Sequence, residues 1–139
     1  MPKKKDFLFF IVALSIIVLD QLTKQLVKNF TNIRIVMNPG SLWGLFPNAT
    51  SLLAWLSVIV VGVFLYNYDN IQKSDLKVKI GSALIVGGAV GNLIDRILYK
   101  GVIDFIRIGW WPSFNIADSA ISIGVILLIC YTLKEEIKN

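Results

Sequence analysis

The sequence predicts an integral membrane protein, a bundle of four transmembrane helices with a small β-sheet on one side of the membrane. Apolar residues make up 55% of its 139 residues, and the mean hydropathy is +0.68. These residues are grouped into runs that contain few or no charges. A helix needs roughly 20 residues to cross the hydrocarbon core, and each run reaches that length once its flanks are included. The runs are residues 7–19, 52–66, 80–94 and 116–133.

The length indicates a single domain over residues 1–139, without internal repeats. A water-soluble four-helix bundle is the alternative, but its helices would keep a charged outer face, and these runs are apolar nearly all round. The first run also has features of a cleaved signal peptide, since lysines occupy positions 3–5. It ends in Asp20-Gln21 without a small-residue cleavage site, which favours a retained helix.

Basic residues lie mostly between the runs, so the net charge of +5 indicates membrane orientation and not nucleic-acid binding. The positive-inside rule places both termini in the cytoplasm and residues 29–50 and 98–114 on the outer side. Eight lysines would share the cytoplasmic side: Lys3, Lys4, Lys5, Lys73, Lys77, Lys79, Lys134 and Lys138. Four basic residues belong to the outer side: Lys28, Arg34, Lys100 and Arg107.

Cysteine and histidine usage excludes several kinds of chemistry. Cys130 is the only cysteine and lies in the fourth run, so no internal disulfide can form. The absence of histidine excludes Ser-His-Asp and Cys-His catalysis and the HExxH zinc site. We therefore expect chemistry based on carboxylates, hydroxyls or lysine, with no metal and no cofactor.

Two outer segments are expected to pair as a small extracytoplasmic sheet. Apolar residues alternate over residues 33–37, before a turn at residues 38–40, and residues 102–108 form the second candidate strand. The same outer segments contain Trp43, Trp110 and Trp111. Interfacial anchoring is the favoured role for these tryptophans, and substrate contact is the alternative.

Charged residues at membrane depth need a partner or a function, since each costs at least ~2.5 kcal/mol. Asp20 and Lys24 are four residues apart and are expected to form an ion pair, with contact to a substrate backbone as the alternative. Asn92, Asp95 and Arg96 follow one another at spacings that place them on one interior face. We expect them to form a scaffold in which Asp95 pairs with Arg96 or another basic group, a direct catalytic role being the alternative.

Asp118 has no basic residue at a helical spacing to neutralise it, and Asp104 lies in the outer segment that precedes the fourth helix. The 14-residue connection between them is short enough to fold back and bring the carboxylates together. Two carboxylates at close range cannot both ionise, so one keeps a proton near neutral pH. The ionised group can then take a proton from water while the other hydrogen-bonds a scissile carbonyl. The alternative is that Asn115 and Asp118 only cap the start of the fourth helix.

Five motifs follow one another along nearly the whole chain: DQLTK at 20–24, NPGSLWG at 38–44, GGAVGNLIDR at 87–96, VIDF at 102–105 and FNIADSAI at 114–121. Together, and in this order, they resemble the motifs of the signal peptidase II family, the bacterial aspartic proteases of prolipoproteins. The resemblance implies four helices, a small outer sheet and a mobile lid segment after the second motif.

The resemblance further implies an aspartic endopeptidase of the bacterial cytoplasmic membrane. It would remove a signal peptide immediately before a diacylglyceryl-modified cysteine, on the outer face, with the prolipoprotein and membrane lipids as partners. The chain is expected to act as a monomer. The implied catalytic pair is Asp104 and Asp118. The implied substrate-binding or site-shaping residues are Asp20, Lys24, Asn38, Gly40, Asn92, Asp95, Arg96 and Asn115.

The second motif departs from the family pattern, which usually reads N-x-G-A-A-F. Here Ser41, Leu42 and Trp43 follow Gly40. The bulkier Leu42 and Trp43 are expected to alter the preference for lipid and signal sequence and to leave the chemistry unchanged.

Two other functions stay open from the sequence. One is a small ion-coupled transporter subunit or assembly factor, whose aspartates would titrate or bind cations during transport. The other is a Ser-Lys protease with Ser41 or Ser113 as nucleophile and Lys24 as base. Asp20, one helical turn from Lys24, would keep the lysine charged and opposes this second function.

Overall fold

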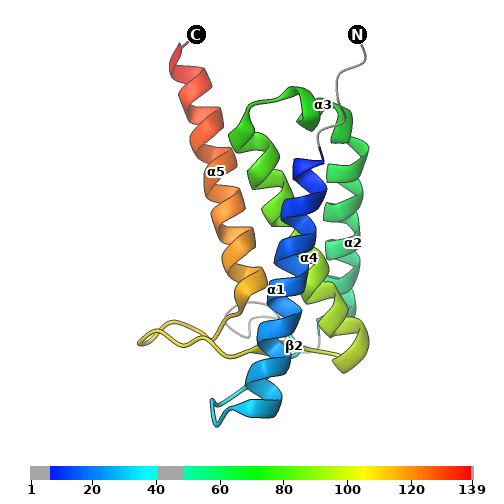
Figure 1. Ribbon diagram of the computed structural model, residues 1–139, viewed down its shortest axis with the longest axis vertical. Helices are drawn as coiled ribbons and strands as arrows, with labels where there is room; N and C mark the ends of the chain where they lie inside the picture. The colour runs from blue at the N-terminus through cyan, green and yellow to red at the C-terminus, as the bar shows by residue number, and fades with distance from the viewer. Residues whose placement is uncertain (1–6, 41–48, 139) are drawn as a thin grey trace.

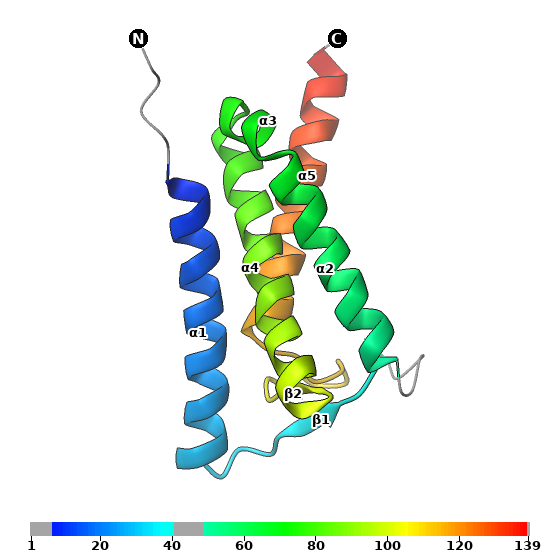
Figure 2. The same cartoon turned by 90° about the vertical axis from the view of Figure 1, so that its right-hand side faces the viewer.

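Helices dominate the computed structural model, which describes residues 7–40 and 49–138 (Figure 1). The start of α1 and the end of α5 lie at one end of the bundle, and both strands lie at the other, the sheet end (Figures 1 and 2). The helices are α1 (Leu8–Phe30), α2 (Thr50–Tyr66), α3 (Tyr68–Lys73), α4 (Leu76–Tyr99) and α5 (Ile116–Lys138). The strands are β1 (Val36–Asn38) and β2 (Val102–Asp104).

Three described helices, α1, α4 and α5, are long and apolar enough to cross a membrane. The α2 helix is equally apolar in character but has 17 residues. Helix α4 is central in the bundle. Of the 18-residue apolar stretch in each helix, 61% is buried in α4, compared with 17% in α1 and 17% in α5. The outer helices expose large apolar side chains such as Leu14, Trp55 and Ile126. This surface suits contact with lipid hydrocarbon and not with water.

Glycines on α4 let two helices approach its backbone closely. A Cβ atom at Gly87 would lie 2.7 Å from the carbonyl oxygen of Ala13 in α1. A Cβ atom at Gly88 would overlap the carbonyl oxygen of Ala117 in α5. Such small-residue faces are the usual means of close helix packing in membranes. The close approach brings polar groups of α1, α4 and the start of α5 within hydrogen-bonding reach.

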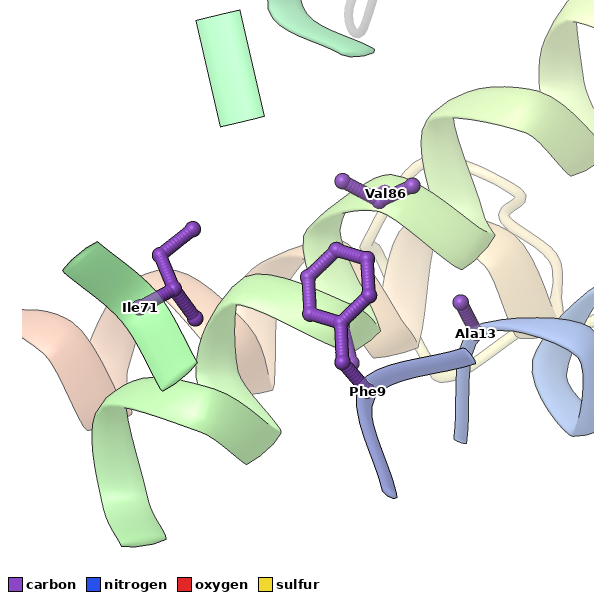
Figure 3. Packing of buried hydrophobic residues seen from close by; sticks show 5 residues of the cluster. Phe9, Ala13, Ile71 and Val86 are labelled. Carbon is purple, nitrogen blue, oxygen red and sulfur yellow. The ribbon is translucent and has the colours of Figure 1, made fainter. Parts of the chain in front are cut away.

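The short helix α3 closes the end of the bundle opposite the sheet and was not predicted from the sequence (Figure 1). Its Ile71 belongs to a cluster of buried apolar residues with Phe9, Ala13, Ala83 and Val86, four of which are labelled in Figure 3. Tyr68 packs edge-on against the Phe9 ring, with ring centroids 5.5 Å apart. With only six residues and a polar sequence, α3 carries too little periodicity to be recognised before the fold is known.

The sheet is smaller than the sequence predicted. The two strands pair antiparallel, with Val36 opposite Asp104 and Asn38 opposite Val102. Residues 33–35 precede β1 because β2 ends at Asp104 and offers them no partner. Asn38, expected in the turn, is the last residue of the strand.

The second predicted strand, residues 102–108, was also too long. Beyond Asp104 the backbone groups bond within a hairpin and not to β1. The N–H groups of Phe105 and Ile106 both donate to the carbonyl of Phe114, and Phe114 N–H donates to the carbonyl of Ile106. This local pairing turns the chain back toward α5 and so brings the end of β2 close to the start of that helix.

We expect the substitution Gly88→Ala to lower the thermal midpoint of the purified protein, because its methyl group would force α5 away from α4. Overpacking of this kind costs about 1–3 kcal/mol. Gly62→Ala is the matched control, since a Cβ there meets nothing within 4 Å and alanine favours the helix. Thermal unfolding in detergent measures both variants, and equal midpoints would contradict the packing role of Gly88.

Candidate active site

Polar side chains from separate elements meet at the sheet end of the bundle. Asp104 is the last residue of β2 and Asp118 lies in the first turn of α5. Asn38 comes from β1, Asn92 from α4, and Asn115 directly precedes α5. The structure therefore brings together two predicted carboxylates and three predicted asparagines that are distant in the sequence.

The Asp104 carboxylate is almost fully buried, with 2% of the residue exposed. Its Oδ2 accepts a hydrogen bond from Asn38 Nδ2 at 3.1 Å, and its Oδ1 accepts one from Asn115 Nδ2 at 2.8 Å. Burial, followed by the nearby negative charge of Asp118, raises the pKa of Asp104 to about 7. The two amide hydrogen bonds act in the opposite direction because they favour the ionised form. Asp104 can thus hold or release a proton near neutral pH.

Asp118 is fixed by a reciprocal cap at the start of α5. Its backbone N–H donates to Asn115 Oδ1 at 2.8 Å, and its Oδ2 accepts from the Asn115 N–H at 3.2 Å. This is the arrangement of a capping box. Asp118 Oδ1 also accepts from Asn92 Nδ2 at 2.8 Å. Asn115 and Asp118 therefore cap the helix, but the alternative that they do nothing else is wrong, because both also bond to residues of other elements.

Asn115 connects the two aspartates and is completely buried. Besides Asp104 Oδ1, its amide nitrogen lies 3.0 Å from Asn92 Oδ1 and 3.3 Å from the carbonyl of Ile103. An amide group has two hydrogens, so it satisfies two of these three acceptors at a time. Within the described residues neither Asp104 nor Asp118 forms an ion pair. Both carboxylates are held by amides, while Lys24 and Arg96 act on them only at longer range than an ion pair.

A buried ion cluster lies directly behind this site. Lys24 Nζ is 2.7 Å from Asp20 Oδ2 and 2.8 Å from Asp95 Oδ2, and all three residues are fully buried. The predicted Asp20–Lys24 pair is confirmed. Asp95 pairs with Lys24, the second of the two options that the sequence left open, and not with the adjacent Arg96.

The ion cluster holds the elements that carry the aspartates. Asp20 Oδ1 accepts from the backbone N–H of Ala117 at 2.9 Å, next to Asp118. Asp95 Oδ2 accepts from the N–H of Ile103 at 3.0 Å, next to Asp104. Asp20, Lys24 and Asp95 therefore act as scaffold.

Gln21 is a member of this cluster that sequence reasoning missed. Its Nε2 lies 3.0 Å from Asp95 Oδ1, 3.2 Å from Asp20 Oδ2 and 3.1 Å from the carbonyl of Gly91. The available signal was its position between two charged residues in an apolar helix, where a polar side chain needs partners.

A cavity of about 560 Å³ extends from the two aspartates between α2, α4 and α5. Asp104, Asp118 and Arg96 contribute charged groups to its lining. Apolar side chains such as Leu56, Val60, Phe64, Ile85 and Val125 line the remainder. The cavity suits an apolar chain whose polar end reaches the carboxylates.

A second cavity, of about 440 Å³, lies on the sheet side of Asp104. Val36, Met37, Trp110 and Pro112 contribute to its lining. It shares Asn38, Asp104 and Ser113 with the larger cavity. An extended ligand could therefore pass from one cavity to the other across Asp104.

The Ser-Lys alternative finds no support in the position of Ser113. The Ser113 hydroxyl accepts a hydrogen bond from Arg107 Nε at 3.1 Å. Lys24 instead forms ion pairs with Asp20 and Asp95. Ser41, Leu42, Trp43 and the expected lid segment lie outside the described residues. The rings of Trp110 and Trp111 on the hairpin are tilted relative to each other, with centroids 5.6 Å apart. Trp110 is 82% exposed, as an interfacial anchor would be.

A family model described as signal peptidase (SPase) II matches residues 12–134. The chain belongs to the signal peptidase II family. This family is one of proteases, so the predicted enzyme class and the motif resemblance are confirmed. The peptidase is 36% identical to the lipoprotein signal peptidase of Halothermothrix orenii, over 91% of this chain and 96% of the relative. It is 32% identical to that of Listeria monocytogenes serotype 4a, over 94% of this chain and 96% of the relative.

Two solved structures share the fold of this signal peptidase II. Both are described as bacterial membrane enzymes determined by the in meso method, at 2.3 and 1.9 Å resolution. The first has a TM-score of 0.83 and 28% identity, and the match covers 92% of this chain and 88% of the other. The second has a TM-score of 0.78 and 29% identity, covering 91% and 92%. The similarity supports the helical fold with its small sheet.

We expect Lys24→Met to destabilise the peptidase strongly, because it leaves Asp20 and Asp95 as buried, uncompensated charges. Breaking a buried ion pair by removing one partner costs about 3–5 kcal/mol. Lys28→Met is the control, since Lys28 is exposed and its Nζ lies 4.6 Å from the Tyr99 ring centroid. Chemical or thermal unfolding in detergent compares the two, and a small loss in the Lys24 variant would contradict the scaffold role.

Proposed function

We propose that the peptidase removes signal peptides from diacylglyceryl-modified prolipoproteins, cutting immediately before the lipidated cysteine, with Asp104 and Asp118 as the catalytic pair. The observation that carries this proposal is the arrangement of these two carboxylates. They share Asn115, form no ion pair among the described residues and line a largely apolar cavity. An apolar signal peptide fits such a cavity, and its scissile bond would lie beside the two carboxylates.

In the proposed reaction Asp104 carries the proton and Asp118 is ionised. Asp118 takes a proton from a water molecule while the water oxygen adds to the scissile carbonyl carbon. Asp104 donates its proton to the carbonyl oxygen, and a neutral gem-diol results. Asp118 then protonates the leaving nitrogen, one diol hydroxyl returns its proton to Asp104, and the C–N bond breaks. Neither metal nor covalent intermediate takes part.

The remaining site residues divide into two groups in this proposal. Asn38, Asn92 and Asn115 orient the carboxylates, and Gly40 supports Asn38 by donating its N–H to Asn38 Oδ1 at 3.0 Å. Arg96 lines the cavity beside both aspartates and is available to substrate oxygens. The buried Asp20, Lys24 and Asp95 hold the scaffold and do not contact substrate.

We further propose a single domain that acts as a monomer and crosses the cytoplasmic membrane four times, with α2 as the fourth span. Seventeen residues lie at the short end of the range that crosses a bilayer. The distribution of lysines supports cytoplasmic termini and a site near the outer face. A substrate with two acyl chains is confined to the same membrane, which holds its cleavage point at the depth of the aspartates.

The direct test incubates purified peptidase with a diacylglyceryl-modified prolipoprotein and follows signal-peptide release. Wild-type protein is expected to cleave the lipidated substrate, while Asp104→Asn and Asp118→Asn lose activity by at least about 10²-fold, since each removes one partner of the acid–base pair. Asp69→Asn in α3 is the control, because this exposed carboxylate lies at the opposite end of the bundle.

The outcomes separate the candidate functions. Cleavage that persists in a folded Asp104 or Asp118 variant would show that the catalytic pair is wrongly assigned. A folded wild-type protein that never cleaves would instead favour a transporter subunit or assembly factor.

The pH dependence tests which aspartate holds the proton. Above a pH of about 7 Asp104 loses its proton, so we expect kcat to fall as pH rises through this value. The Asn38 amide favours ionised Asp104, so Asn38→Ala should move this alkaline limb to higher pH and lower the rate at its maximum. Single-turnover cleavage, measured across about pH 5–9 where the fold is expected to persist, gives both the position of the alkaline limb and the maximal rate. A limb that stays fixed or moves to lower pH would contradict the role of Asp104.

A further inference from the structure

Thr50, the first residue of α2, contacts two segments that are distant in the sequence. Its Oγ1 lies 2.6 Å from the carbonyl oxygen of Pro39 and 3.0 Å from that of Lys100. A hydroxyl has one proton, so Thr50 donates to one carbonyl at a time or shares the proton between them. The contact joins the end of β1, the start of α2 and the end of α4.

Pro39 directly follows Asn38, whose amide donates to Asp104. The carbonyl oxygen of the same side-chain amide, Asn38 Oδ1, accepts a hydrogen bond from the Gly40 N–H. This bond orients the amide so that its NH2 group faces Asp104. The β1 strand has only three residues, and proline cannot donate a backbone hydrogen bond beyond it. The strand pairing alone therefore gives this turn little support.

Lys100 provides a fixed point for the contact. It ends α4 in the left-handed conformation, at φ 56°, and its N–H donates to the carbonyl of Arg96 at 3.2 Å. Gly101 follows, where a Cβ would lie 3.3 Å from the Asn38 carbonyl oxygen, and β2 then leads to Asp104. The Thr50 hydroxyl thus ties the turn that carries Asn38 to the segment that carries Asp104.

We propose that Thr50 is a positioning residue, which holds the Asn38 amide against Asp104 through its hydroxyl group and makes no contact with substrate. The inference rests on the proposed role of Asp104. Thr50 is not among the residues that line the two cavities. It also lies outside the five motifs, so its role follows only from the contacts to Pro39 and Lys100.

The test compares Thr50→Val, which keeps the shape but removes the hydroxyl, with Thr50→Ser, which keeps the hydroxyl. For Thr50→Val we expect kcat to fall about 5-fold with KM unchanged, as when one positioning hydrogen bond is lost. Thr50→Ser should restore most of the rate. Thr132→Val is the matched control, because that hydroxyl donates only within α5, to the carbonyl of Leu128 at 3.0 Å.

Two further measurements distinguish positioning from a general loss of stability. The alkaline limb of the rate should move to higher pH in Thr50→Val, as in Asn38→Ala, because ionised Asp104 loses its amide donor. The charged groups that act on Asp104 from the surrounding helices, Asp118, Lys24 and Arg96, are unchanged in these variants. In an Asn38→Ala background, Thr50→Val should cost nothing further. Additive losses, or an unmoved limb, would overturn the inference.

Hydrogen exchange gives a readout that does not depend on cleavage. Thr50→Val should speed exchange in the segment 36–40, where the Gly40 N–H depends on Asn38. Unchanged exchange there would overturn the positioning role even if the rate falls. An inactive wild-type protein would overturn the proposed function, while the exchange result would still decide whether Thr50 holds this turn.

Discussion

The sheet end of the bundle depends on the buried ion pairs that Lys24 forms with Asp20 and Asp95. Removing three charges from water costs several kcal/mol per ion, so the cluster is tolerable only when the remaining protons and lone pairs are satisfied. Asp20 and Asp95 meet this condition by accepting the backbone N–H groups of Ala117 and Ile103. The electrostatic requirement of the cluster therefore fixes the start of α5 and the strand β2. These elements carry the two proposed catalytic carboxylates.

Four aspartates lie in this region, and their surroundings separate them into two pairs with different properties. Asp20 and Asp95 share the ammonium group of Lys24, each in a direct ion pair. Asp104 and Asp118 accept hydrogen bonds only from amide groups within the described residues. Two carboxylates without a cation in direct contact keep a proton between them, which is what acid–base hydrolysis requires. Aspartate thus has a structural role at positions 20 and 95 and a proposed catalytic role at positions 104 and 118.

The sequence predicted contacts that depend on local spacing and missed those that depend on packing. The Asp20–Lys24 pair follows from a separation of one helical turn, and the helices follow from hydropathy. Asp95 pairs with Lys24 and not with Arg96 because of the face that α4 presents to α1. The close packing at the glycines of α4 determines that face. The reach of Asn115 to Asp104 depends on the path of the hairpin between them. The strand ends, α3 and the partners of Gln21 likewise required three-dimensional pairing that periodicity does not encode.

The use of asparagine around the proposed dyad has a physical reason. A cation in direct contact would let both carboxylates ionise, and the proton needed for catalysis would be lost. An amide N–H carries only partial charge, so Asn38, Asn92 and Asn115 fix the positions of the carboxylate oxygens without removing that proton. Asn92 also separates the two charge systems, because its Oδ1 lies 3.3 Å from Lys24 Nζ while its Nδ2 donates to Asp118. With the Asn92 side chain between them, Lys24 can stabilise the fold without contacting Asp118. The proton shared by Asp104 and Asp118 is therefore retained.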